Sequence, residues 1–160
     1  ARGTLAHKTY EGKLDGAGIR CALVIGRFNN FFTDKLREGA IDCLVRHGTP
    51  VESISVTYVP GSFEIPPVAA RLAKSGRFDA VVCLGAIIRG DTPHFEYVAA
   101  EAAKGVAQVA MNASVPIIFG IVTADTLEQA VERSGTKAGN KGWDAALSAL
   151  EMVSLYKAID

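Results

Sequence analysis

The feature that most constrains the fold of this chain is a regular alternation of short apolar runs with longer amphipathic segments. Apolar runs of strand length end near residues 26, 59, 88 and 123, and apolar residues at helical spacing follow each one. Strands that are apolar on both faces are typical of a parallel sheet covered by helices on both sides. We therefore predict an α/β fold, with strands over 20–26, 53–59, 79–88 and 116–123 and helices over 33–47, 62–75, 93–112, 125–134 and 143–153.

The length of the chain, 160 residues, predicts a single domain over 1–160. We expect residues 1–8 to form a flexible tail, and residues 9–14 to add an N-terminal strand that pairs with the sheet edge of a neighbouring subunit. The glycine-rich segment 135–142 lacks the GxxxxGK[ST] pattern of a phosphate-binding loop. A solvated linker between two helices is its simpler interpretation.

The composition argues against several classes of protein. The chain has 17 Lys plus Arg and 17 Asp plus Glu, whereas nucleic acid and anionic membranes select a basic surface. The longest apolar stretches have about half the length of a membrane span. The three cysteines lie far apart and only three histidines are present, which predicts buried thiols, no metal site and a reducing, cytoplasmic location. Because the chain starts without Met, organellar import with a removed targeting peptide stays open as an alternative.

A ligand is expected at the carboxyl ends of the predicted strands, because open parallel sheets bind ligands beyond that edge. Four segments end there, at residues 26–29, 60–64, 85–94 and 123–125. None of the four contains the GxGxxG fingerprint of dinucleotide-binding proteins. The chemistry must therefore be inferred from single side chains in these segments.

The segment 90–94 offers both an anion site and a proton-transfer group. Thr92 is expected to cap a helix that begins at Pro93, which leaves backbone N–H groups unsatisfied and able to bind an anion. Asp91 has the wrong charge for a phosphate, so the cation must come from elsewhere. His94 would lie in the first turn, where the helix dipole favours a neutral imidazole suited to a general base or proton shuttle. A structural histidine bonded to a neighbouring side chain is the alternative.

Other side chains at this edge are open to two interpretations each. Phe28 could stack on a planar ring or anchor its loop to the core. Glu64 could accept hydrogen bonds from ligand hydroxyls or simply complement a helix dipole. The backbone of Ile87 and Ile88 could bind the amide edges of a heterocycle while their side chains form the pocket wall.

Five motifs in order resemble the lumazine synthase family over roughly residues 9–158. They are RFN at 27–29, VPGSFE at 59–64, GAIIRGDTPHF at 85–95, FGIVT at 119–123 and ERSGTKAGNKG at 132–142. The resemblance implies a flavodoxin-like three-layer sandwich with a four-stranded parallel sheet and helices on both faces. It also implies the penultimate step of riboflavin biosynthesis. In that step 5-amino-6-(D-ribitylamino)uracil and L-3,4-dihydroxy-2-butanone 4-phosphate give 6,7-dimethyl-8-ribityllumazine, phosphate and water.

The resemblance further implies which residues form the site, with His94 as the proton-transfer residue. The pyrimidine and ribityl groups would contact Phe28, Ser62, Phe63, Glu64, Ala86, Ile87, Ile88 and Phe119, and the phosphate would contact Asp91, Thr92 and Arg133. Phe119 and Arg133 would come from the adjacent subunit, so that Arg133 supplies the missing cation. Lys141 is a weaker candidate for the pyrimidine side. Many relatives have Ala where this chain has Ser62.

No cofactor or metal is implied by the resemblance, and the expected partners are small-molecule substrates and further copies of the chain. Members of the family form pentamers, and in many of them twelve pentamers build a sixty-subunit icosahedral shell. The compact segment 135–142 favours the shell, and riboflavin synthase is the implied downstream partner. The alternative is a flavin-binding, lumazine-binding or cage-forming protein without turnover, which the presence of His94 and Arg133 disfavours.

Overall fold

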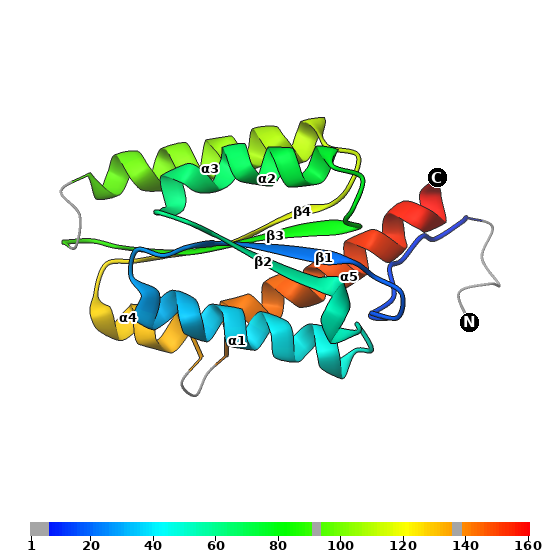
Figure 1. Cartoon of the computed structure of the whole chain (residues 1–160), viewed down its shortest axis with the longest axis horizontal. Coiled ribbons are helices and arrows are strands. Elements are labelled where there is room, and N and C mark those ends of the chain that lie inside the picture. Colours follow the sequence, from blue (N-terminus) through cyan, green and yellow to red (C-terminus); the bar gives the residue numbers. More distant parts are fainter. Residues whose placement is uncertain (1–6, 91–93, 136–138) are drawn as a thin grey trace.

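A parallel sheet in the strand order β2-β1-β3-β4 forms the middle layer of the molecule (Figure 1). The computed structural model describes residues 7–90, 94–135 and 139–160. The strands are β1 (Cys21–Gly26), β2 (Ile54–Val59), β3 (Ala80–Ile88) and β4 (Ile117–Ala124). The predicted four-stranded parallel sheet is therefore confirmed.

Helices cover both faces of this sheet (Figure 1). One face carries α1 (Asn30–Arg46), α4 (Leu127–Arg133) and α5 (Lys141–Ile159), and the other carries α2 (Ile65–Lys74) and α3 (Phe95–Asn112). Alternate side chains of β1 serve the two layers, because successive residues of a strand point to opposite faces. Leu23 packs into the cluster beneath α1 and α5, and Val24 packs into the cluster beneath α2 and α3. This two-sided burial explains why the strand is apolar throughout.

Helices α1 and α2 begin at other residues than the sequence predicts. Helix α1 begins before residue 33, because Asn29 adopts a left-handed conformation with φ 67° and turns the chain directly out of β1. The segment 62–75 is not one helix, because the 3₁₀ turn η3 (Ser62–Glu64) precedes α2. Glu64 supports this turn, since its Oε1 accepts a hydrogen bond from the backbone N–H of Gly61 at 2.9 Å.

The cap of α4 also differs from the predicted one. The spacing of Asp125 and Glu128 predicts a capping box, but the helix is capped by Thr126. The Thr126 hydroxyl accepts from the Gln129 backbone N–H at 3.1 Å, and Gln129 Oε1 accepts from the Asp125 N–H at 2.8 Å. Thr126 and Gln129 therefore take the roles that the spacing assigns to Asp125 and Glu128.

Helix α3 begins at Phe95, with His94 as its N-cap residue. The predicted cap at Thr92 and the predicted first residue Pro93 lie outside the described residues. Within the described ranges, no helix is both long and apolar enough to cross a bilayer.

The described part of the N-terminal segment, residues 7–14, forms no strand within a single chain. It runs beside α5 (Figure 1), and the backbone N–H of Lys13 donates to Ser154 Oγ at 2.9 Å. Its pairing with the sheet edge of a neighbouring subunit stays a prediction. Most of the predicted flexible tail, residues 1–6, lies outside the described residues.

Candidate active site

A cavity of about 300 Å³ lies beyond the carboxyl ends of β1, β2 and β3. The chain passes from β1 to β2 on one side of the sheet and then crosses back to β3 and β4 on the other side, so the switch point lies between β1 and β3. Doubly wound sheets bind ligands at this point. The structure thus brings together side chains from the first three segments that the sequence singled out. The cavity is lined by Phe28, Asn29, Pro60, Gly61, Ser62, Phe63, Glu64, Ala86, Ile87 and Val98.

Hydrogen bonds to backbone carbonyls hold the loops around this cavity together. The N–H of Phe28 donates to the carbonyl of Pro60 at 3.0 Å, which ties the loop after β1 to the loop after β2. The Asn29 side-chain amide donates to the carbonyl of Ala86 at 2.9 Å and ties both to β3. Glycine at position 85 makes room for Ser62, because a Cβ there would lie 2.4 Å from the Ser62 hydroxyl oxygen. The cavity is therefore pre-formed by the chain's own contacts.

Two phenyl rings on this cavity face solvent rather than the core. Phe28 is 53% exposed and Phe63 is 57% exposed. Rings this exposed contribute little to the core, so the interpretation of Phe28 as a loop anchor is disfavoured. The rings instead provide an apolar surface on which a planar ligand can stack.

The end of β3 offers backbone groups to a ligand in the cavity. The β1–β3 pairing ends at Ile25 and Leu84, whereas the β3–β4 pairing continues to Ile88. The edge of β3 that faces β1 is thus released from the ladder beyond Leu84. Ile87 lines the cavity, but the Ile88 side chain packs among Phe32 and other apolar residues beneath α4. Ile88 can therefore contribute only its backbone.

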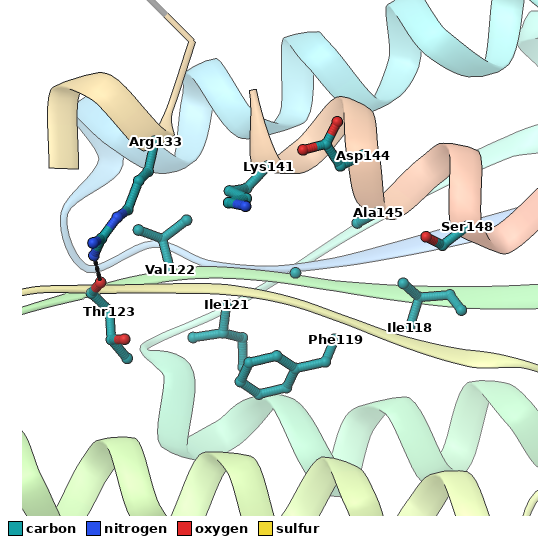
Figure 2. A pocket seen from close by; sticks show the side chains of 11 residues that line it. Ile118, Phe119, Ile121, Val122, Thr123, Arg133, Lys141, Asp144, Ala145 and Ser148 are labelled. Atoms are coloured by element: carbon teal, nitrogen blue, oxygen red, sulfur yellow. Dashed lines mark hydrogen bonds between the residues drawn. The ribbon is translucent and has the colours of Figure 1, made fainter. Parts of the chain in front are cut away.

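A second cavity, of about 610 Å³, lies along the edge strand β4 (Figure 2). It is lined by Ile118, Phe119, Gly120, Ile121, Val122, Thr123, Arg133, Lys141, Asp144, Ala145 and Ser148. Arg133 reaches from α4 and donates a hydrogen bond to the carbonyl of Thr123. Figure 2 shows Arg133 and Lys141 on the α5 side of β4, and Phe119 on the other side. Within one chain, Phe119 and Arg133 therefore do not join the cavity that contains Phe28.

His94 lies at the start of α3, is exposed, and does not line the smaller cavity. Its backbone carbonyl accepts from the Val98 N–H at 2.9 Å, and Val98 itself does line that cavity. Asp91 and Thr92, which the sequence assigns to the phosphate, lie outside the described residues.

Arg89, immediately after β3, contacts the two residues that follow His94 in the sequence. Its Nε donates to Asp125 Oδ1 at 2.9 Å, and its Nη1 donates to Glu96 Oε1 at 3.4 Å. Its guanidinium also lies over the ring of Phe95, 4.6 Å from the ring centroid. The hydrogen bonds to Asp125 and Glu96 raise the pKa of Arg89 above its ordinary value.

The cysteines are buried, as the sequence predicted, and they are unsuited to nucleophilic chemistry. All three thiols are buried and unpaired. Burial raises the pKa to about 12 for Cys21 and for Cys83, and to about 11 for Cys43. Thiols with such values stay protonated near neutral pH. Among the residues that the structure describes, no group of three or more His, Cys, Asp or Glu side chains could hold a metal ion.

Sequence reasoning missed several residues that line the smaller cavity. Asn29 and Val98 are the most informative, because one bridges two loops and the other comes from α3. The only signal for Asn29 is its place beside Phe28 after a strand, where asparagine tolerates positive φ better than most residues. Val98 carried no signal beyond helical spacing.

A comparison with known protein families matches residues 18–157 to the family model described as 6,7-dimethyl-8-ribityllumazine synthase. The match spans most of the chain and includes every segment that lines the two cavities.

Proposed function

The chain belongs to the 6,7-dimethyl-8-ribityllumazine synthase family. From this premise we propose that it catalyses the condensation of two substrates that forms 6,7-dimethyl-8-ribityllumazine. The two substrates are 5-amino-6-(D-ribitylamino)uracil and L-3,4-dihydroxy-2-butanone 4-phosphate. The observation that carries the proposal is the 300 Å³ cavity at the switch point of the sheet, with two exposed phenyl rings and a β3 edge that is no longer paired with β1 beyond Leu84. A planar pyrimidine with a polyhydroxylated side chain needs this combination of surfaces.

The pyrimidine would stack on Phe28, and its amide edges would bind the backbone of residues 86–88. The ribityl hydroxyls would bind near Ser62 and Glu64, which line the same cavity. Glu64 Oε1 already accepts from the Gly61 N–H, so the carboxylate is held in one orientation. This arrangement supports the small cavity as the site of the aromatic substrate.

The phosphate of the second substrate needs a cation, and we propose that Arg133 of an adjacent copy supplies it. Arg133 and Phe119 both line the second cavity, from opposite sides of β4, and neither lines the cavity that contains Phe28. Phe119 is 47% exposed on β4, which is the edge strand of the sheet. An exposed ring and a guanidinium on this edge are suited to complete a neighbour's site, since the planar guanidinium binds phosphate oxygens in pairs. The proposed assembly is a homo-oligomer of pentamers, twelve of which form a shell.

The proposed reaction proceeds by proton transfers around groups that are already reactive. The aromatic amine attacks the ketone, water leaves and an imine forms. Loss of a proton then allows phosphate to leave by elimination, which turns the neighbouring carbinol carbon into a second ketone. The ribitylamino nitrogen attacks this ketone, and ring closure expels a second water. His94 would move protons at these steps, and the walls of the cavity would hold the two substrates in contact. Positioning two reactants can supply about 7–11 kcal/mol of the barrier, so modest acid–base help is sufficient.

A turnover assay tests this function directly. The assembled protein is mixed with both substrates, and lumazine absorbance and phosphate release are followed together. We expect the two products to form in equal amounts and faster than in buffer. Arg133→Ala should raise the KM for the phosphorylated substrate more than the KM for the pyrimidine. No acceleration over buffer in an assembled sample would overturn the proposal in favour of a ligand-binding or cage-forming role.

A further inference from the structure

We infer that Arg89 is a positioning residue that fixes the start of α3, and with it His94, against the carboxyl end of β4. The inference rests on the proposed function, because it assigns Arg89 a part in the turnover that His94 would support. Arg89 itself lies outside both cavities. It is therefore argued to act through another residue rather than on a substrate.

The contacts of Arg89 join three elements at one point. The residue extends β3, its backbone N–H donates to the carbonyl of Ala124 at 2.9 Å, and its Nε donates to Asp125 just beyond β4. From the same guanidinium, Nη1 donates to Glu96 Oε1, and the guanidinium carbon lies over the ring of Phe95. Phe95 and Glu96 are the two residues that directly follow His94. Fixing them fixes the helix turn from which His94 projects.

Arg89 is followed by a glycine on the way to α3. Gly90 has φ 93°, a conformation that few residues other than glycine adopt, and nothing packs where its side chain would be. At the other end, the side chain of His94 does not cap the helix. Arg89 provides a second, non-covalent path between the sheet and the helix.

The same end of β4 also supports the residue proposed for phosphate binding. Asp125 N–H donates to Gln129 Oε1 in the first turn of α4, and Arg133 at the end of α4 donates to the carbonyl of Thr123. Residues 123–125 thus contact α4 directly and are linked to α3 through Arg89. His94 and Arg133 are each held relative to one strand end.

Geometry rather than stability is the expected contribution of Arg89. The side chains of Arg89, Glu96 and Asp125 are 51%, 81% and 63% exposed, and exposed ion pairs stabilise a fold little. A small displacement of a reacting group, in contrast, can reduce a rate about 100-fold. Lysine would preserve the charge but not the fork of two donors or the stacking on Phe95. Arg89→Lys should therefore restore only part of the lost rate.

The chain contains a matched control at the opposite end of the sheet. Arg20 pairs with Asp79 through Nε at 3.3 Å and Nη2 at 3.1 Å, and its side chain is 49% exposed. Arg20 and Asp79 directly precede β1 and β3, so the pair lies at the amino ends of the strands, and neither residue lines either cavity. Arg20→Ala removes a comparable ion pair without touching the proposed site.

The experiment compares kcat, KM and thermal unfolding for the assembled unaltered protein, Arg89→Ala, Arg89→Lys and Arg20→Ala. We expect Arg89→Ala to lower kcat about 10-fold or more with KM for the pyrimidine little changed, and Arg89→Lys to lie between. Arg20→Ala should leave kcat unchanged, and the two alanine variants should unfold at similar temperatures. Combining Arg89→Ala with His94→Ala should cost little beyond His94→Ala alone, because both changes remove one function.

Two results would overturn the inference while the proposed function survives. One is a kcat for Arg89→Ala equal to that of Arg20→Ala. The other is a full additional loss when Arg89→Ala is placed in the His94→Ala background, which would mean that Arg89 acts independently of His94. Absence of turnover by the unaltered protein would instead overturn the proposed function, and the inference with it.

Discussion

At the scale of single residues, Asn140 organises the segment that the sequence presents as a glycine-rich linker. Its side-chain Nδ2 donates to the carbonyls of Lys35 at 2.9 Å and Ser134 at 3.2 Å. Its Oδ1 accepts from the N–H groups of Gly142 at 2.7 Å and Trp143 at 3.1 Å, which caps α5. The interpretation as a solvated linker therefore fails at Asn140, which joins α1, α4 and α5. Residues 136–138 lie outside the described residues.

Replacing Asn140 should destabilise the protein. Asn140→Ala removes the cap of α5 and leaves part-buried backbone groups without their partners, so we expect a loss of about 2–3 kcal/mol in the free energy of unfolding. Urea denaturation monitored by circular dichroism measures it. Asn112→Ala is the control, because the Asn112 side chain is exposed and donates to the Gln108 carbonyl within its own helix. Equal effects of the two substitutions would contradict a structural role for Asn140.

His94 is the residue whose chemical role is easiest to test. We expect His94→Ala to slow turnover about 100-fold, at the low end of the range for acid–base residues, because substrate positioning is left intact. Steady-state kinetics at saturating substrates measures the change in kcat. Full activity in this variant would remove His94 from the mechanism. His7→Ala serves as the control, since His7 is exposed in the N-terminal segment.

At the scale of elements, the sequence predicts the strands better than the helix ends. A short run that is apolar at every position fits the central strand of a covered sheet. In β1, Leu23 packs into the core on one face and Val24 into the core on the other. Helix ends depend on local competition. At α1 the left-handed Asn29 starts the helix early, and at α4 Thr126 takes the cap that the spacing assigns to Asp125. The first residue of a helix therefore depends on local contacts that hydrophobic periodicity does not encode.

The buried strands also predict how the protein responds to alkali. Burial raises the pKa of Cys21 in β1 and of Cys83 in β3 to about 12, whereas an unfolded thiol ionises near pH 8.5, about the ordinary value. The folded state therefore favours the protonated thiol. This stabilisation is complete below about pH 8.5 and is lost as the pH rises towards 12. Each thiol should lower the unfolding free energy by about 1.4 kcal/mol per pH unit in that window.

Denaturation between pH 8 and pH 11 measures this slope. The matched variant Cys21→Ala with Cys83→Ala should show a flatter dependence on pH, because it lacks both ionising groups. Identical slopes in the two proteins would show that other groups govern the alkaline loss of stability.

At the scale of the whole molecule, part of the site could be predicted and part could not. Parallel strands bring their carboxyl ends to one edge, so Phe28, Ser62 and Ile87 were expected to meet, and they line one cavity. Arg133 lies in a different cavity of the same chain. Which copy of the chain supplies Arg133 depends on how molecules associate, and neither hydrophobic periodicity nor the fold of one chain contains that information. The shared site is therefore the central claim to test.

Complementation between two impaired variants tests it most directly. His94→Ala subunits retain Arg133, and Arg133→Ala subunits retain His94, so the two are dissociated, mixed in equal amounts and reassembled. If each site takes His94 from one copy and Arg133 from the next, random mixing restores about a quarter of the sites, since neighbours meet head to tail. With the phosphorylated substrate well below the KM of the Arg133→Ala variant, we predict that turnover recovers to about a quarter of that of the unaltered protein, while each variant reassembled alone keeps only its own low rate. A mixture no more active than the two variants separately would contradict the shared site.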